Sequence, residues 1–309
     1  MAETMATRQA YGKTLIELGE KYPQLVVMDA DLSKSTMTAE FGKTYPDRFF
    51  NMGIAEQNLY GAAAGLALSG KIVCASTFAM FATGRAFEII RNSIGYTRAN
   101  VKICATHAGI TVGEDGASHQ TFEDIALMRT IPGMTVINPS DGVSAKKLLE
   151  QAVAMEGPCY VRLGRAKVPV FYEDSDQLTL GRGNLVRDGK DVTIVATGIM
   201  VSEAMAAAEK LKEDGIDARI IDIHTIKPID EEILIKAAQE TGAIVTAEEH
   251  SIIGGLGSAV AEVIVKNCPV KMAMVGQKDT YGESGKPDEL KKKYGMTAED
   301  IEAAVKNLI

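Results

Sequence analysis

The sequence predicts an α/β protein of two domains, each a mostly parallel sheet with helices on both faces. Apolar runs of strand length alternate with helix-like stretches from end to end, and the alternation pauses only around residues 169–190. The 309 residues also suit two domains of roughly 150 residues each. We therefore expect a first domain over residues 1–168, a linker over 169–190 and a second domain over 191–309.

The first domain opens with a predicted helix over Arg8–Lys21, in which Tyr11, Leu15 and Leu18 share one face and Thr7 is the N-cap. Its strands are expected at Leu25–Asp29, Ile72–Ser76, Val101–Thr106, Met134–Asn138 and Cys159–Arg162. Those of the second domain are expected at Val192–Thr197, Ala218–Ile221 and Ala243–Glu248, with a helix over about Val201–Lys212.

Composition excludes several classes of function. A formal charge of −8 gives no basic surface for nucleic acid or an anionic membrane. The start of the chain has no signal-peptide pattern, and no apolar run approaches the roughly 20 residues that span a bilayer. Cys74, Cys104, Cys159 and Cys268 are too far apart for a disulfide framework or a zinc site. We expect a cytoplasmic protein with buried thiols and no metal ligands of its own.

The densest chemistry lies in the segment from Thr106 to Gln120, directly after a predicted strand. It holds His107, Asp115, His119 and three glycines, which permit unusual backbone angles. Ligands bind at the carboxyl ends of strands in parallel α/β sheets. We favour a functional loop over the alternative, a surface loop that caps the next helix.

Glu56 follows a glycine turn and lies in the first turn of a predicted helix. Taken alone, it is better explained as a complement to the helix dipole than as a catalytic group. Phe78 and Phe81 are three residues apart at the start of the helix that contains Arg91. Their spacing favours core packing over a platform for ring stacking.

Two isolated arginines, Arg8 and Arg165, and the segment Asp31–Ser35 complete the candidates. Arginine suits phosphate recognition because its planar fork pairs two oxygens at once. A solvated surface role is equally compatible with the spacing, so both alternatives stay open.

At these residues the sequence resembles the transketolase family over essentially its whole length, most specifically from His107 to Gln120. The resemblance implies a pyrimidine-binding domain, a carboxy-terminal domain and thiamine diphosphate as cofactor. The family's Gly-Asp-Gly motif and paired asparagines, which hold magnesium, do not occur here. The resemblance therefore implies a separate amino-terminal transketolase subunit that holds the diphosphate and the magnesium, in a heterotetramer containing a homodimer of this chain.

The resemblance also implies roles for single residues. Glu56 would contact N1′ of the aminopyrimidine, and His119 would lie near the reacting carbon. Asp115 would contact the C2 hydroxyl of the substrate. The other cofactor-binding residues would be Asp31, Leu32, Phe78, Phe81 and Arg91. The residues that hold the phosphate of the sugar would be Arg8, Ser35, His107 and Arg165.

The implied activity is transfer of a two-carbon ketol unit from a ketose phosphate to an aldose phosphate, as in the pentose phosphate pathway. The chain departs from the family at Gly84, Ala117 and Ser118. The residues around Glu56 are closer to deoxyxylulose-phosphate synthases and to β subunits of 2-oxo-acid dehydrogenases, which are the alternatives, together with a non-catalytic scaffold. Asp115 and His119 favour polyol phosphates over a short apolar keto acid.

The second domain offers fewer clues. His224 and the Glu248–Gly257 segment resemble the carboxy-terminal domain of the family. The glycines could open a helix start to anions. We favour a structural interpretation, a tight turn from strand to helix near a dimer interface.

Overall fold

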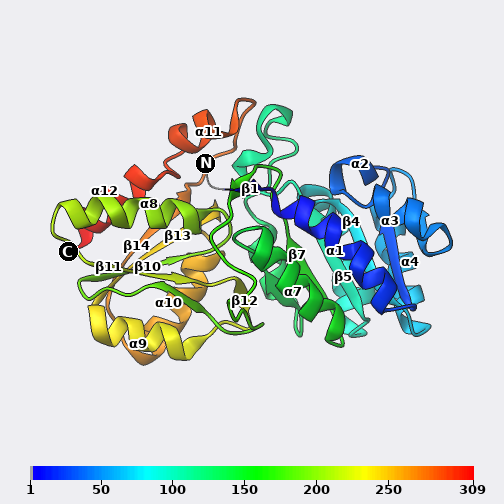
Figure 1. Cartoon of the computed structure of the whole chain (residues 1–309), viewed down its shortest axis with the longest axis horizontal. Helices are drawn as coiled ribbons and strands as arrows, with labels where there is room; N and C mark the ends of the chain where they lie inside the picture. The colour runs from blue at the N-terminus through cyan, green and yellow to red at the C-terminus, as the bar shows by residue number, and fades with distance from the viewer. Residues whose placement is uncertain (1–2) are drawn as a thin grey trace.

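The computed structural model describes residues 3–309 and contains two α/β domains that lie side by side (Figure 1). The first domain is built on a seven-stranded sheet of order β12-β6-β7-β5-β4-β2-β3. Its strands are β2 (Leu25–Asp29), β3 (Phe49–Asn51), β4 (Ile72–Phe78), β5 (Val101–Thr106), β6 (Thr135–Ile137), β7 (Cys159–Arg162) and β12 (Thr225–Lys227). Neighbouring strands pair in parallel except β12, which runs antiparallel to β6.

Successive strand residues point to opposite sides of this sheet, and helices cover and bury both faces. On one side, Tyr11, Leu15 and Leu18 of α1 (Thr7–Lys21) pack with α7 (Gly142–Ala154), which confirms the predicted apolar face. On the other side, α4 (Glu56–Leu68) and the π-helical turns of η3 (Ile90–Tyr96) pack against the sheet. The fully buried strands explain why the sequence shows continuous apolar runs.

Shorter elements connect these layers. They are β1 (Thr4–Met5), α2 (Ser33–Thr36), α3 (Ala39–Thr44), η1 (Pro46–Arg48), η2 (Phe81–Arg85), α5 (Phe87–Ile89), η4 (Ile110–Asp115), α6 (Asp124–Thr130) and β8 (Val168–Pro169). The strands β1 and β8 pair antiparallel and bring the start of the chain beside the end of the first domain.

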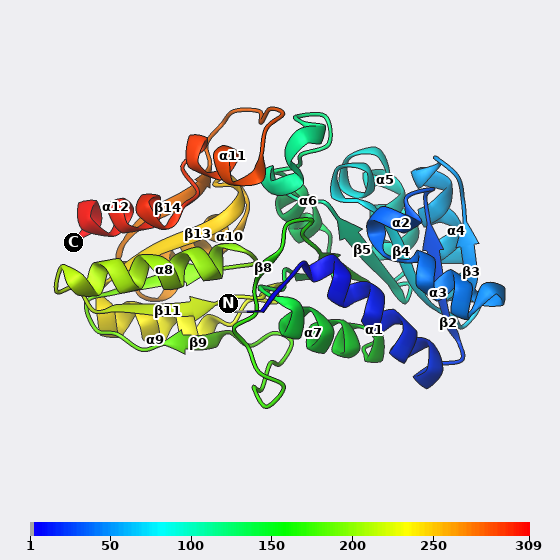
Figure 2. The same ribbon diagram turned by 45° about the horizontal axis from the view of Figure 1, so that its top comes forward.

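The second domain has a five-stranded sheet of order β14-β13-β10-β11-β9. Its strands are β9 (Asn184–Arg187), β10 (Val192–Ala196), β11 (Ala218–Asp222), β13 (Ala243–Ser251) and β14 (Lys271–Gln277). Its helices are α8 (Met200–Glu213), α9 (Glu231–Thr241), α10 (Leu256–Asn267), α11 (Pro287–Lys293) and α12 (Ala298–Leu308). Figures 1 and 2 show α8 and α12 on one face of the sheet and α9 and α10 on the other.

The two domains share apolar packing. One buried cluster runs from Ile125 and Ile131 of the first domain to Leu234, Ile244 and Leu256 of the second. Strand β12 adds to this connection because it comes from the second half of the chain and extends the first sheet. The predicted fold class is therefore confirmed, with the two sheets more tightly joined than a linker would suggest.

Two local predictions were wrong, and a third was correct only in part. The N-cap of α1 is Ala6 rather than Thr7, whose hydroxyl instead accepts a hydrogen bond from the Gly164 backbone at 2.8 Å. The proposed linker over 169–190 contains β9, an edge strand that pairs with β11 and lacks a clear apolar alternation. The predicted helix that contains Arg91 is present, but as π-helical turns around the short helix α5, a type that the spacing of apolar residues did not reveal.

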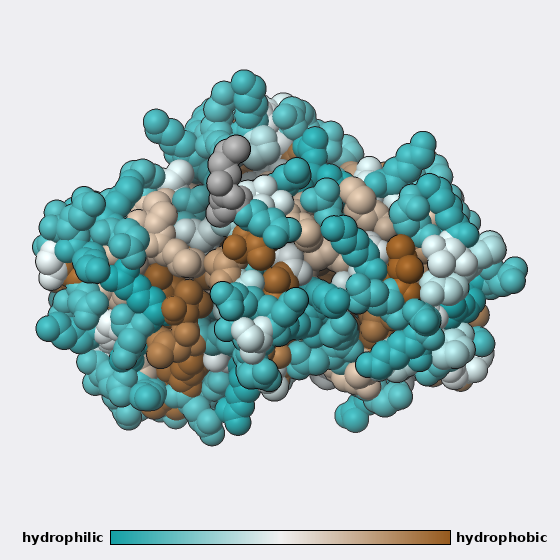
Figure 3. Space-filling view, in the orientation of Figure 1, coloured by the Kyte–Doolittle hydropathy of each residue, from teal (hydrophilic) through white to brown (hydrophobic). Residues whose placement is uncertain are grey.

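Other features agree with the sequence. Cys74, Cys104 and Cys159 are buried free thiols, and Cys268 is partly buried. Within residues 3–309, no helix combines the length and the apolar character that crossing a membrane requires. The face in Figure 3 is mostly hydrophilic, and its hydrophobic side chains gather in small separate patches.

The carboxylate of Asp141 ties the start of α7 to the segment that leaves the first domain. One oxygen accepts from the Ser144 backbone at 2.8 Å, as a helix N-cap. The other accepts from the backbone N–H groups of Phe171 and Tyr172 at 3.0 and 2.9 Å. Asp141 is fully buried, so water cannot replace these hydrogen bonds.

We predict that Asp141→Ala lowers the free energy of unfolding by about 2–4 kcal/mol, because three buried donors lose their acceptor. Urea denaturation followed by circular dichroism measures this change. The control, Asp288→Ala, removes a carboxylate that is 94% exposed and changes the stability by less than about 0.5 kcal/mol. Equal free energies of unfolding for the two variants would show that the hydrogen bonds accepted by Asp141 do not stabilise the fold.

Candidate active site

The candidate residues follow the carboxyl ends of neighbouring parallel strands. Strands β2, β3, β4, β5 and β7 all end at the same edge of the first sheet. The segments that leave this edge carry Ser35 after β2, Glu56 after β3, Phe78 at the end of β4, His107 after β5 and Arg165 after β7. The parallel topology thus brings together side chains that are up to 130 residues apart (165 − 35 = 130).

A buried carboxylate shapes the loop after β2. Asp29 accepts hydrogen bonds from the Leu32 backbone at 2.6 Å and from the hydroxyls of Thr36 and Thr38 at 2.6 and 3.0 Å. Burial raises the pKa of Asp29, although these hydrogen bonds favour its charged form. Asp31 adopts a positive φ of 65° and exchanges hydrogen bonds with Asn51. Sequence analysis missed Asp29, which it treated only as the last residue of a strand.

A basic group forms where α1, the β2 loop and the end of β7 meet. Arg8 donates to the backbone carbonyl of Ser35 at 2.6 Å. Burial and the charge of Arg165 lower the pKa of Arg8, so the two guanidinium groups are close enough to repel. The Nε atom of Arg8 is buried and finds no hydrogen-bond partner among residues 3–309. Buried donors are normally satisfied, so this atom points to an acceptor supplied by a ligand.

His107 belongs to the same group. It is 3% exposed, and its backbone has a positive φ of 57°, which is rare for a residue other than glycine. Burial, with the charges of Arg8 and Arg165, lowers its pKa to about 3. Its Nδ1 atom lies 2.9 Å from the Thr106 hydroxyl. A neutral imidazole between two arginines can donate to an oxyanion without adding a third positive charge.

Arg165 also reaches the loop that carries the histidines. It donates to the Val112 carbonyl and pairs with Glu114 at 2.9 Å. This loop closes on itself through a hydrogen bond from the Gly109 backbone to the Thr121 carbonyl at 3.1 Å. Arg165 therefore both joins the basic group and supports the segment around it.

Aromatic rings line the same region. Phe78 stacks on His107 with ring centres 3.9 Å apart, and the rings of Phe78 and Phe81 are nearly parallel, with centres 6.0 Å apart. Phe81 meets the edge of His119 at 5.3 Å. The two phenylalanines therefore face site histidines, which the core-packing interpretation of their spacing did not predict. A flat ligand ring can stack on such a surface.

Glu56 is almost fully buried at the start of α4. Its oxygens lie 2.9 and 3.1 Å from one terminal nitrogen of Arg85, whose guanidinium lies 4.9 Å from the centre of the Phe81 ring. Arg85 was missed because its contact with Glu56, 29 residues earlier, has no signal in the sequence pattern. A buried carboxylate that faces a stacked planar cation is also suited to a planar ligand with N–H donors.

The remaining candidates lie toward the solvent. His119 is partly buried, and its Nδ1 atom is 3.0 Å from the Ser118 hydroxyl. Asp115 is exposed at the end of η4, and Leu32 is partly buried. Arg91 is exposed and donates to Asn92 at 2.7 Å, whereas Arg85 is the arginine that contacts Glu56.

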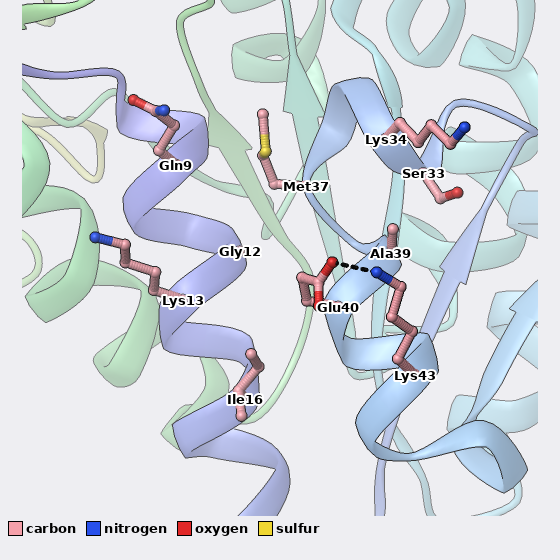
Figure 4. Close-up of a pocket in the computed structure, with 10 residues that line it drawn as sticks. All are labelled: Gln9, Gly12, Lys13, Ile16, Ser33, Lys34, Met37, Ala39, Glu40 and Lys43. Carbon is pink, nitrogen blue, oxygen red and sulfur yellow. Dashed lines mark hydrogen bonds and ion pairs between the residues drawn. The ribbon is translucent and has the colours of Figure 1, made fainter.

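Two further features bound the site. Within residues 3–309, no group of three or more His, Cys, Asp or Glu side chains is placed to hold a metal ion. A hollow of about 370 Å³ lies between α1 and the α2–α3 segment, beside the basic group (Figure 4). There Lys13 and Lys34 point away from each other, and Glu40 pairs with Lys43 at 2.6 Å. This arrangement leaves no convergent set of polar groups in the hollow.

Comparison with known families defines the class of protein. Residues 3–170 match the pyrimidine-binding domain of transketolase, and residues 181–301 match the transketolase C-terminal domain. The chain therefore belongs to the transketolase family, whose members are transferases that depend on thiamine diphosphate.

Comparison with single relatives shows which kind of transketolase chain this is. The chain is 57% identical to a putative transketolase C-terminal section of Methanocaldococcus jannaschii, over 95% of this chain and 93% of that protein. It is 44% identical to a 6-deoxy-6-sulfo-D-fructose transketolase subunit of a Clostridium species, over 95% and 91% of the two chains. All of this chain aligns with only 50% of human transketolase, at 37% identity. It is a subunit of a split transketolase.

A solved structure supports the same conclusion. A split-gene transketolase, described as an inactive β4 tetramer, has a TM-score of 0.93 and 56% identity over 98% of both chains. These comparisons confirm the expected transketolase subunit. They do not favour a dehydrogenase β subunit or a deoxyxylulose-phosphate synthase.

We predict that the His107 ring titrates near pH 3 and that inorganic phosphate raises its pKa, because a bound anion offsets Arg8 and Arg165. NMR of isotope-labelled histidine measures both values. His224 is the internal control, because burial alone lowers its pKa to about 4. Titration of His107 near the ordinary value of about 6.5, or an equal response of both rings to phosphate, would contradict the assignment.

Proposed function

We propose that this subunit, paired with a separate amino-terminal subunit, transfers a two-carbon ketol unit from a ketose phosphate to an aldose phosphate. The observation that carries this proposal is the buried donor of Arg8 that has no partner among residues 3–309. Arg8 and Arg165 both act on the pKa of His107, and the His107 ring stacks on Phe78. This arrangement suits a ligand with a phosphate at one end and a reacting group near a flat cofactor ring.

In this proposal, the basic group binds the phosphate of the sugar. Arg8 and Arg165 supply the charge, and His107 donates as a neutral ring. The Ser35 carbonyl orients Arg8, while its hydroxyl adds a further donor. Binding at this distant end fixes the carbonyl end of the substrate, so remote binding energy lowers the entropy cost of the reaction.

The other end of the site fits the aminopyrimidine of thiamine diphosphate. A buried carboxylate and two parallel phenylalanine rings are what a flat ring with a basic nitrogen requires. Thiamine diphosphate, when bound, supplies a carbon nucleophile that protein side chains lack. Glu56 would hold the proton at N1′, and Asp31 and Leu32 would line the pocket that holds the cofactor. Arg91 stays a proposed cofactor contact, although Arg85 is closer to Glu56.

In this proposal, Arg85 occupies the place of the aminopyrimidine when the cofactor is absent. It now makes the two contacts that an aminopyrimidine needs, one with Glu56 and one with the Phe81 face. Because its side chain is 51% exposed, it can turn toward solvent when a ring enters. His119, at the edge of Phe81, would then face the reacting carbonyl, and Asp115 would contact the C2 hydroxyl.

We assign the diphosphate and magnesium to the partner subunit. The support is that human transketolase has another half that this chain does not match. The assembly we propose is a heterotetramer built on a homodimer of this chain. The free buried thiols suit a reducing cytoplasm, where the pentose phosphate pathway would use this reaction.

The direct experiment mixes this chain with its candidate amino-terminal subunit, thiamine diphosphate and magnesium. We expect ketol transfer between a ketose phosphate and an aldose phosphate. Glu56→Gln should lower kcat by about a hundredfold or more, because the amide cannot take up the N1′ proton. Mixtures that decarboxylate pyruvate without ketol transfer, or retain full activity with Glu56→Gln, would refute the proposal.

Arg8→Ala tests the phosphate assignment separately. We expect KM for phosphorylated sugars to rise by about tenfold or more, because a charged hydrogen bond is lost. KM for an unphosphorylated donor should change little. Arg182→Ala, at a remote and exposed ion pair, is the matched control. Equal losses on both classes of donor would remove Arg8 from phosphate binding.

A further inference from the structure

The second domain reaches the His107–Gln120 loop through Glu249, near the end of β13. The Thr111 backbone donates to this carboxylate at 2.7 Å. Gly109 makes the approach possible: a Cβ there would lie 2.3 Å from the carboxyl carbon of Glu249, and its φ is +78°. The contact therefore depends on one glycine of the loop and one carboxylate of the other domain.

Glu249 is 2% exposed. Burial raises its pKa, whereas the charge of Arg162 and the hydrogen bond from Thr111 favour the charged form. Its Oε2 lies 3.9 Å from Arg162, which also pairs with Asp124 at 2.7 Å and donates to the Glu249 carbonyl at 2.8 Å. Arg162 is the last residue of β7, three residues before Arg165. One buried guanidinium thus joins the site edge of the first sheet to the end of β13.

A second contact holds the other end of the loop. The side-chain amide of Gln120 donates to the Glu283 carbonyl at 2.9 Å. Gly282 leaves room for Gln120, because a Cβ at Gly282 would lie 1.9 Å from its amide oxygen. Figures 1 and 2 both show the segment before α11 beside this loop.

The loop also bonds the end of β13 directly. The Ser251 backbone donates to the Phe122 carbonyl at 2.8 Å, just beyond Gln120. The loop is therefore held at Thr111, Gln120 and Phe122 by groups of the second domain, while His107 and His119 face the phenylalanines.

We propose that Glu249 is a positioning residue for the substrate: its carboxylate fixes the loop that carries His107, Asp115 and His119. This gives the second domain a role in substrate binding, and it rests on the proposed function. Within residues 3–309, the polar contacts of Glu249 are with Thr111 and Arg162. The residues proposed to face the cofactor, Glu56, Phe78 and Phe81, lie outside the loop that Glu249 holds. Its loss should therefore affect the sugar phosphate and leave the cofactor unaffected.

The test compares Glu249→Ala with Glu249→Gln in the reconstituted enzyme. The alanine loses the acceptor for Thr111, and we expect KM for the ketose phosphate to rise by about tenfold, since small displacements of binding groups are costly. Glutamine keeps an acceptor oxygen and should restore KM to within about threefold of the unmutated enzyme. The affinity for thiamine diphosphate should be the same in all three. An unchanged KM in Glu249→Ala, or no rescue by glutamine, would overturn the proposal.

Two further measurements keep the test decisive. Gly282→Ala places a Cβ against the Gln120 side chain and leaves Glu249 in place, so KM should again rise. This variant keeps the proposal testable if Glu249→Ala does not fold. Glu262→Ala is the control: Glu262 bonds Arg129 across the domains at 2.9 Å, is 60% exposed and does not touch the loop. A KM for Gly282→Ala no higher than that of Glu262→Ala would overturn the proposal.

Hydrogen exchange separates this inference from the proposed function. In the chain alone, the Thr111 amide should exchange at least about tenfold faster in Glu249→Ala than in Glu249→Gln. If the unmutated pair transfers no ketol unit, the proposed function fails, and the exchange rates still decide whether Glu249 holds the loop. Equal exchange in both variants would refute the positioning role even in an active enzyme.

Discussion

The first sheet imposes one constraint on which the whole site depends: five of its parallel strands end at the same edge. A parallel sheet buried on both faces has few places for polar groups except at this edge. Polar and aromatic residues lie at or just after the ends of all five strands: Asp29, Glu56, Phe78, His107 and Arg165. Basic, acidic and aromatic groups distant in sequence thereby share one small region, in which the Phe78–His107 stack joins the basic group to the aromatic rings.

The second domain completes this arrangement. It shares an apolar cluster with the first domain, lends β12 to the first sheet and contacts the histidine loop through Glu249 and Glu283. The glycine-rich segment after β13 is a turn from strand to helix, in which Glu248 accepts from the Leu256 and Gly257 backbones and so fills the start of α10. The chain's own carboxylate occupies the place that an external anion would take.

Sequence analysis predicted the fold well because both of its signals are local: buried strands are continuous apolar runs, and α1 has a clear apolar face. The site residues came mainly from family resemblance, since spacing alone favoured a helix-dipole role for Glu56 and core packing for the phenylalanines. Arg85 was missed because its partner, Glu56, lies 29 residues earlier in the chain. Asp29 was missed because the pattern of apolar residues does not show that it accepts hydrogen bonds from the loop that follows its strand. The linker prediction was wrong for a similar reason, since β9 is recognisable only by its pairing with β11.

The central claim is that this chain forms only the aminopyrimidine and sugar-phosphate side of the site. Calorimetric titration of thiamine diphosphate and magnesium into the chain alone, and into its mixture with the amino-terminal subunit, tests this claim most directly. We expect saturable tight binding only in the mixture, with weak or no heat in the chain alone. Tight binding by the isolated chain, followed by complete catalytic turnover, would contradict the account.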